Sequence, residues 1–382
     1  MKFALVAGEA SGDTLGAALM DALRSTDPAA CFVGVGGPKM QARGLVMLAS
    51  ADELAVMGIT EVLAHLPRLL ALRSRLRREL RAAQVDVYVG IDAPEFNLGL
   101  ARWLKKRGLK TVQYVSPQVW AWRQGRVKTI GQAVDLVLCL LPFETDFYQR
   151  HQVRAEFVGH PLADQIPLHP DRAAARVALG IDAEATVLAV LPGSRVGEVS
   201  RLGADFAAAA VRYAALRGAA APIVVLVPLI NEATRTAFDG AVRHIEGAAQ
   251  LRRLQGQAQL ALVAADVVLV ASGTATLETM LCKRPMVVAY RLGAVTAALL
   301  RGLGLVKVPY FSQPNLLLGA KRVPEYFQEA VQPEVLAAAL QAESADPKRV
   351  EALQQQFLEQ HQRLRLGGAQ RAADAIHHLL RP

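Results

Sequence analysis

Short apolar runs alternate along the chain with longer segments rich in Ala, Leu and Arg. In the first half of the sequence the runs lie at residues 3–7, 32–35, 85–91, 110–115, 136–141 and 157–159. Runs of this length are typical of buried strands, and the segments between them are long enough for crossover helices. The alternation therefore predicts βαβ units and a parallel sheet.

The same alternation begins again after the segment "GHPLADQIPLHPD", residues 159–171, whose prolines are typical of a linker. The later runs lie at residues 186–191, 223–227, 266–271 and 286–289. We predict an α/β protein with two doubly wound Rossmann-like domains, residues 1–163 and 164–332, that face a cleft. A ligand is expected in that cleft, beyond the carboxyl ends of the strands. Residues 333–382 are predicted to form a helical tail that packs back on the first domain.

Composition narrows the class of protein. With 382 residues, of which 52% are hydrophobic, the chain can bury the cores of about two domains. Its cysteines, Cys31, Cys139 and Cys282, lie far apart and form no C-x-x-C pair, which disfavours disulfides and zinc and suits a reducing cytoplasm. The N-terminal apolar run is too short for a signal peptide, and no run approaches the length of a membrane span. We therefore expect a protein that is soluble or bound to a membrane surface.

The formal net charge of +9 is concentrated in patches. Residues 96–134 contain no acid, and residues 68–81 carry six arginines against the single acid Glu79. Such surfaces attract nucleic acid, an anionic membrane or an anionic substrate. Nucleic acid is disfavoured, because the basic segments carry few aromatic residues to stack bases and no known binding module is present.

Two strand ends in the second domain are suited to phosphate. The run 186–191 leads into Pro-Gly-Ser-Arg, where a helix start and the planar fork of Arg195 favour an anion. The run 266–271 leads into Ser272, Gly273 and Thr274, with Glu278 one turn into the next helix. Two such termini can hold a diphosphate, and Glu278 can accept hydrogen bonds from a ribose diol. Ordinary helix caps and solvated side chains are the alternative. Neither G-x-G-x-x-G at a strand end nor G-x-x-x-x-G-K-[ST] occurs, which disfavours nicotinamide enzymes and NTPases.

The first domain offers carboxylates at its strand ends. In "GEASGD", Ser11 and Gly12 allow a substrate to approach the backbone, and Glu9 and Asp13 supply acids; capping by Ser11 or Asp13 is the alternative. Asp92 directly follows the run 85–91, so its side chain is expected to point into the cleft as a candidate general base. Capping of the next turn is the alternative for Asp92.

The segment at residues 58–80 interleaves leucines with arginines around Pro67, which is expected to divide it into two short helices. Leucines on more than one face, together with arginines, suit the interface of an anionic bilayer. A core helix with a solvated basic face is the alternative. The expected membrane contacts are Leu63, Leu66, Leu69, Leu70, Arg73 and Arg77.

Seven motifs, "GEASGD", "GIDAPEFN", "YVSPQVWAWR", "FVGHPLAD", "LPGSRVGEV", "ASGTATLE" and "PMVVAYR", occur in this order across nearly the whole chain. Together they resemble the lipid-A-disaccharide synthase family. The resemblance implies an inverting GT-B glycosyltransferase of outer-membrane biogenesis. The family's reaction moves the sugar of UDP-2,3-diacylglucosamine onto 2,3-diacylglucosamine 1-phosphate, which forms a β-1,6 disaccharide 1-phosphate and releases UDP.

The resemblance also implies roles for single residues. The second domain would bind UDP through Gly193, Ser194, Arg195, Ser272, Gly273, Thr274 and Glu278. Asn315, in the matching motif "SQPNLLLG", would contact the nucleotide or donor, with a loop amide bonding its own backbone as the alternative. The first domain would bind the lipid acceptor, and Asp92 would be the base. No Asp-x-Asp pair is present, so neither a metal nor a cofactor is expected, and Arg195 and helix dipoles would offset the charge of the leaving group.

The enzyme would then work in the cytoplasm, peripherally bound to the inner membrane. The sequence is compatible with a homo-oligomer and does not determine the oligomeric state. Two alternatives remain. Another UDP-sugar transferase or a UDP-sugar epimerase of the same fold would keep the nucleotide site without needing lipid substrates. A non-enzymatic protein of the membrane surface would explain the basic patches but not the strand-end motifs.

Overall fold

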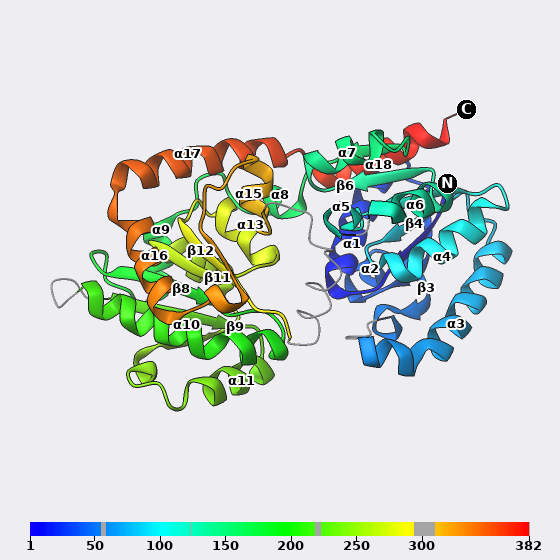
Figure 1. Cartoon of the computed structure of the whole chain (residues 1–382). Helices are drawn as coiled ribbons and strands as arrows, with labels where there is room; N and C mark the ends of the chain where they lie inside the picture. The colour runs from blue at the N-terminus through cyan, green and yellow to red at the C-terminus, as the bar shows by residue number, and fades with distance from the viewer. Residues whose placement is uncertain (55–58, 123, 218–222, 294–309, 382) are drawn as a thin grey trace. The chain divides into compact units, whose positions relative to one another are not determined.

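The computed structural model describes residues 1–54, 59–122, 124–217, 223–293 and 310–381, with the backbone alone for 59–66, 121 and 122 (Figure 1). The chain divides into two compact units. One contains Met1–Asp164 and Leu364–Pro382, and the other contains Gln165–Arg363. Each unit has its own parallel sheet with helices on both faces.

The first unit has a seven-stranded parallel sheet in the order β3-β2-β1-β4-β5-β6-β7. Its strands are β1 (Lys2–Ala7), β2 (Cys31–Gly36), β3 (Leu45–Ser50), β4 (Val87–Ile91), β5 (Lys110–Tyr114), β6 (Leu136–Cys139) and β7 (Ala155–Phe157). Its helices are α1 (Ala10–Thr26), α2 (Pro38–Ala42), α3 (Ile59–Ala82), α4 (Pro94–Lys105), α5 (Val119–Trp122), α6 (Val127–Ala133), α7 (Pro142–Gln149), α8 (Pro161–Gln165) and α18 (Gly368–Leu380).

Alternate residues of β1 point to opposite faces of this sheet. Phe3 and Leu5 pack with α1 and α18 in one buried core. Ala4 and Val6 pack with α3, α4, α6 and α7 in another. The sheet is thus buried on both faces, which explains why its central strands read as continuous apolar runs.

The second unit has a six-stranded parallel sheet in the order β10-β9-β8-β11-β12-β13. Its strands are β8 (Thr186–Leu191), β9 (Ile223–Leu229), β10 (Arg252–Gln255), β11 (Val267–Ala271), β12 (Met286–Tyr290) and β13 (Glu325–Phe327). Its helices are α9 (Arg172–Ala178), α10 (Val196–Arg217), α11 (Glu232–Val242), α12 (Ala258–Ala264), α13 (Thr274–Leu281), α15 (Gln313–Leu318), α16 (Pro333–Ala345) and α17 (Pro347–Leu364). Strands β3, β10 and β13, which the apolar pattern did not predict, all lie at sheet edges.

The predicted tail is divided between the units, so the expectation that residues 333–382 pack on the first domain is wrong for most of it. Leu336 and Leu340 of α16 are fully buried in the core of the second unit, where α16 packs against α10. Ile376 of α18 is buried against α1 in the first unit. The apolar face of α16 is thus buried in the core of the second unit, and that of α18 in the core of the first.

The prediction that Pro67 divides the leucine- and arginine-rich segment is also wrong. A single helix, α3, runs from Ile59 to Ala82 with Pro67 inside it. An interior proline removes one hydrogen bond of a helix and crowds the carbonyl four residues earlier, at a cost of about 3 kcal/mol. Leu72, Leu76 and Leu80 offset this cost, because they bury the following turns in the core of the first unit. Among the described residues, no helix combines the length and the hydropathy that crossing a bilayer requires.

Candidate functional site

The order of strands reverses direction between β1 and β4 in the first sheet and between β8 and β11 in the second. In doubly wound sheets, the carboxyl ends of the two strands at such a reversal are where ligands bind. The candidate residues of both units follow these four strands. "GEASGD" follows β1 and Asp92 follows β4, whereas Pro-Gly-Ser-Arg follows β8 and Ser-Gly-Thr follows β11.

Asp92 lies in a strained turn between β4 and α4. Its φ is 53° and that of Ala93 is 40°, so two successive non-glycine residues adopt the left-handed conformation. Each such backbone conformation costs roughly 1–3 kcal/mol of folding free energy, so it persists only where the surrounding structure holds it. Strain of this kind is concentrated at functional sites. The Asp92 N–H donates to the Tyr114 carbonyl at 2.9 Å, which ties the turn to the end of β5.

The side-chain amides of two buried residues, Asn97 and Gln113, hold this turn in place. The Asp92 carbonyl accepts hydrogen bonds from Asn97 Nδ2 at 2.9 Å and from Gln113 Nε2 at 3.0 Å. Asn97 Nδ2 also lies 3.2 Å from the Val6 carbonyl, and its Oδ1 accepts from the Tyr88 hydroxyl at 2.9 Å. Asn97 and Gln113 are fully buried. They are therefore positioning residues for Asp92, and the sequence analysis missed both.

The carboxyl group of Asp92 lies in a partly dry environment. Burial raises its pKa above the ordinary value, opposed by a hydrogen bond from the Ala93 backbone. Within the described part of the chain, no Lys or Arg forms an ion pair with it. A carboxylate that is desolvated and unpaired is a stronger base than one in water, as a proton acceptor requires.

The turn after β1 packs directly against the Asp92 turn. A methyl group added at Gly8 would lie 2.8 Å from Ala93 Cβ, and one at Gly12 would lie 3.2 Å from Ala7 Cβ. Gly8 is therefore needed for this close packing, whereas a side chain at Gly12 would require a small shift of Ala7. Glu9 and Ser11 are exposed at the start of α1, where Glu9 makes no side-chain cap.

Asp13 does not serve the site as expected. It is 4% exposed, and its carboxylate accepts the backbone N–H groups of Gly37 at 2.8 Å, Lys39 at 3.0 Å and Met40 at 3.0 Å. These are the orphan donors at the start of α2. Capping was the alternative, and the structure shows it on a different helix from the one that carries Asp13. Three accepted N–H bonds leave it unsuited to act as a base.

A buried acid that the sequence analysis missed holds the next strand end. Glu144 is 4% exposed and accepts hydrogen bonds from the Leu141 N–H at 3.0 Å and from Trp120 Nε1 at 3.2 Å. Burial raises the pKa of Glu144 to about 7. The hydrogen bonds of Glu144 to Leu141 and Trp120 fix the loop of "YVSPQVWAWR", where Val115 adopts a φ of 75°.

In the second unit, the turn after β8 is already occupied by a side chain. Glu198 Oε2 accepts the N–H groups of Ser194 at 3.0 Å and Arg195 at 3.4 Å. A methyl group at Gly193, whose φ is 133°, would lie 2.5 Å from Glu198 Cβ. The Arg195 side chain itself is exposed. A phosphate that bound these N–H groups would have to displace Glu198, a competitor that the sequence analysis missed.

The turn after β11 is open. Gly273 and Thr274 are exposed at the start of α13, and no atom of the described residues lies within 4 Å of a methyl group added at Gly273. The Ser272 hydroxyl donates to the Phe311 carbonyl at 3.2 Å. Glu278 is partly buried, burial raises its pKa, and none of the described residues forms a hydrogen bond or ion pair with its side chain. It is thus an acceptor without a protein donor beside an open helix start.

Asn315 is not available to contact a ligand directly. It is fully buried. Its Nδ2 donates to the Val323 carbonyl at 2.9 Å and to Glu325 Oε1 at 2.8 Å, and its Oδ1 accepts the N–H groups of Arg322 and Val323. These four bonds use the whole capacity of an amide. The alternative of a local backbone bond is what the structure shows, and Asn315 positions the segment that follows Ser312.

The expected membrane contacts are only partly free. The side chains of Leu63 and Leu66 lie outside the described residues. Leu70 is 50% exposed and Leu69 is partly buried. The Arg73 guanidinium lies 4.9 Å from the ring centre of Phe96, and that of Arg77 lies 5.5 Å from Trp103. The two arginines thus pack on aromatic rings of the first unit, which differs both from free membrane contacts and from the solvated basic face of the core-helix alternative.

Comparisons with known proteins agree with one another. A family model described as lipid-A-disaccharide synthetase matches residues 3–376. The chain is 51% identical over 381 residues to lipid-A-disaccharide synthase of Xanthomonas euvesicatoria, covering 99% of this chain and 86% of the relative. It is 52% identical over 373 residues to that of Sodalis glossinidius, covering 97% and 96%.

Among solved structures, UDP-GlcNAc 2-epimerase of Neisseria meningitidis has a TM-score of 0.65 at 10% identity and covers 100% of this chain and 99% of its own. WaaG, a glycosyltransferase involved in lipopolysaccharide biosynthesis, has a TM-score of 0.58 at 12% identity and covers 98% and 99%. At these identities the structural matches establish the fold alone.

Proposed function

Because the chain belongs to the lipid-A-disaccharide synthase family, we propose that it transfers the sugar of UDP-2,3-diacylglucosamine to 2,3-diacylglucosamine 1-phosphate. It is a glycosyltransferase that forms the lipid A disaccharide. The observation that carries the proposed mechanism is the half-buried, unpaired Asp92 in its braced, strained turn.

We propose that Asp92 is the general base. The 6-hydroxyl oxygen of the acceptor forms a bond to the anomeric carbon of the donor from the face opposite UDP. Its proton passes to Asp92, and the bond from the anomeric carbon to the diphosphate breaks, so the electron pair leaves on UDP. This displacement inverts the configuration and gives a β-1,6 linkage. A positioned base typically contributes two to four orders of magnitude to such a rate.

The second unit is proposed to bind the UDP part of the donor. Arg195 would neutralise the leaving diphosphate, together with the helix starts at Gly193 to Arg195 and at Ser272 to Thr274. Glu198 would leave the N–H groups of Ser194 and Arg195 as phosphate replaces its carboxylate. Glu278 would accept hydrogen bonds from the ribose, because it is partly buried without a protein donor.

The first unit is proposed to bind the acceptor at the exposed Glu9 and Ser11, beside the Asp92 turn. We further propose that the enzyme binds peripherally to the cytoplasmic face of the inner membrane, through the amino-terminal part of α3. The exposed Leu70 and the excess of arginine over acid in α3 support this.

The direct test is a transfer assay with both diacylated substrates, scored by UDP release and by the mass of the product. A tetraacyl disaccharide 1-phosphate supports the proposal. Turnover of UDP-N-acetylglucosamine without acyl chains would instead favour an epimerase or another UDP-sugar transferase. The Asp92→Asn variant is the control, since it should bind UDP without forming product.

A further inference from the structure

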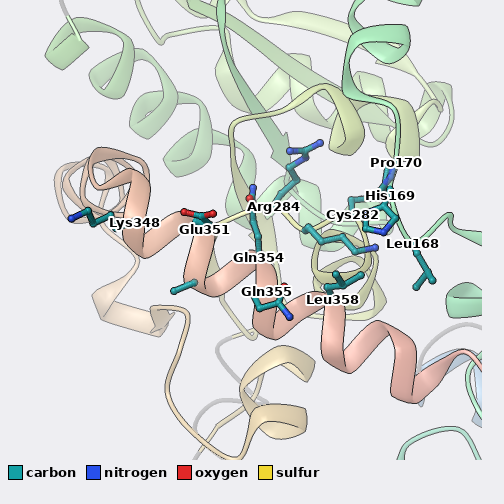
Figure 2. A pocket seen from close by; sticks show the side chains of 12 residues that line it. Leu168, His169, Pro170, Cys282, Arg284, Lys348, Glu351, Gln354, Gln355 and Leu358 are labelled. Atoms are coloured by element: carbon teal, nitrogen blue, oxygen red, sulfur yellow. The ribbon is translucent and has the colours of Figure 1, made fainter.

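A cavity with cationic walls lies in the second unit, away from the strand ends described above. It has a volume of about 630 Å³ and is bounded by the segment Leu168–Pro170, the turn Cys282–Arg284 and α17 (Figure 2). The turn leads into the amino end of β12, whereas the proposed donor site follows the carboxyl end of β11. Since β11 and β12 are parallel, the two sites lie at opposite ends of the strands of this sheet.

Arg284 is a buried cation in the wall of this cavity, and none of the described residues forms an ion pair with it. It is 8% exposed, and its Nη2 donates to the Val263 carbonyl at 2.8 Å. Its Nε is buried without a hydrogen-bond acceptor among the described residues. An uncompensated buried charge is costly, and an arginine does not escape the cost by releasing its proton at neutral pH.

Two further arginines, Arg172 and Arg176, lie near Arg284 and add to the local positive charge. Burial, together with these two arginines, lowers the pKa of Arg284 to about 10 against the opposing effects of Cys282 and Asp266. Asp266 is already shared, because it pairs with Arg172 and Arg176 and accepts the Val187 N–H at 2.8 Å. This carboxylate therefore does not balance all three guanidinium groups.

The wall contributed by the other elements is suited to an anion. His169 and Lys348 add cationic or hydrogen-bonding groups, and Gln354 adds an amide on α17 (Figure 2). Among the described residues that line the cavity, Glu351 is the one acid. We propose that this cavity binds a phosphate group, from inorganic phosphate, a phosphomonoester or a lipid headgroup, with Arg284 as its main ligand. Arginine with lysine and amide donors is a typical phosphate-binding set.

The test measures binding of inorganic phosphate to the full-length protein by ³¹P NMR and calorimetry, without UDP and with ionic strength held constant with KCl. We expect saturable binding to one site, at least about tenfold weaker in Arg284→Gln, since a lost charge-assisted contact is worth this much. Arg243→Gln, an exposed arginine of the same unit outside the cavity, is the matched control.

Two further arms keep the outcome decisive. Circular dichroism establishes whether Arg284→Gln folds; if it does not, Lys348→Gln on the exposed side of α17 replaces it. Repeating the titration in Arg195→Ala separates this site from the donor site, because binding that disappears with Arg195 belongs to the donor site and overturns the proposal.

Vesicles of phosphatidylglycerol, compared with phosphatidylcholine, distinguish the lipid source. Vesicle binding that requires Arg284, without binding of free phosphate, would assign a headgroup. Equal phosphate and vesicle binding in wild type, Arg284→Gln and Lys348→Gln overturns the proposal. None of these results depends on transfer activity.

Discussion

Both units place candidate chemistry at the same point of the same topology, where the strand order reverses, yet they hold it in different ways. In the first unit the turn at Asp92 is strained, and buried Asn97 and Gln113 grip its carbonyl. In the second unit the turns at Gly193 and Gly273 are eased by glycine, and Arg195 and Thr274 are exposed.

The difference follows from what each site has to do. A base must meet one proton at hydrogen-bond distance, so its backbone needs to be fixed. A diphosphate is a large and highly charged ligand, which the N–H groups of helix starts and a long arginine can capture over a range of positions. A rigid turn suits the first task. Glycine turns beside an exposed arginine suit the second, with Glu198 covering the N–H groups of Ser194 and Arg195 until phosphate replaces it. The changes below test that contrast, in decreasing order of the effect we expect.

Asp92→Asn removes the base while keeping the size of the side chain. We expect the turnover number to fall by roughly two to four orders of magnitude with UDP affinity close to that of the wild type. Single-turnover kinetics and calorimetry with UDP measure the two quantities. Glu95→Gln is the matched control, because it only breaks an exposed ion pair with Arg126. Equal losses in both variants would remove Asp92 from the role of base.

Arg195→Ala removes the exposed cation of the second unit. We expect weaker UDP binding and transfer slower by about a hundredfold or more, the usual size of the loss of one preorganised charge stabiliser. The unfolding transition should stay unchanged, since Arg195 is exposed. Wild-type kinetics in this folded variant would show that the diphosphate is bound elsewhere.

Asn97→Ala loosens the turn without touching the carboxylate. Because a misplacement of about 1 Å can cost a hundredfold, we expect turnover to fall by roughly 10- to 100-fold with UDP affinity retained. The free energy of unfolding should also fall by about 1–3 kcal/mol, because the Tyr88 hydroxyl and the carbonyls lose their partner. A loss of stability with unchanged turnover per folded molecule would reduce Asn97 to a structural residue.

The pH dependence of kcat/KM should reveal the environment of Asp92. Burial raises its pKa, and the ionised form is the active one, so activity should fall as the pH decreases through that raised pKa. The fall should approach tenfold per pH unit and begin at a higher pH than for an ordinary aspartate. The residual activity of Asp92→Asn should lack this limb, and a limb that persists there belongs to another group.

Replacing Leu69 and Leu70 with Ser tests the membrane surface, which lies outside the contrast between the two sites. We expect weaker binding to anionic vesicles in a sedimentation assay, with a small change in stability because Leu70 is half exposed. Leu72→Ser is the contrasting variant, since Leu72 is 5% exposed and should lose stability instead. A large loss of stability in the first variant with unchanged vesicle binding would favour a core role for the whole of α3.

The family, the α/β fold with two parallel sheets and the order of the strand-end motifs could all be predicted from the sequence. The family prediction is confirmed by the match over residues 3–376. Nearly all the predicted apolar runs became strands, because a strand buried on both faces needs a continuous apolar run that is visible locally. Two of the edge strands, β10 and β13, were missed for the converse reason: both are short and partly solvated, and their pairing depends on a neighbour.

The hydrogen-bond partners of the polar side chains could not be predicted in this way, because they depend on the folded chain. Asp13 reaches the start of α2, Asn315 is saturated by its own loop, and Glu198 covers the N–H groups beside Arg195. Asn97 and Gln113 meet at the Asp92 carbonyl from two different elements. A hydrogen bond or ion pair depends on atoms that chain folding brings within about 3 Å, and neither residue type nor local spacing encodes that distance. Hydrophobic periodicity is a property of the segment itself and can therefore be read before the chain folds.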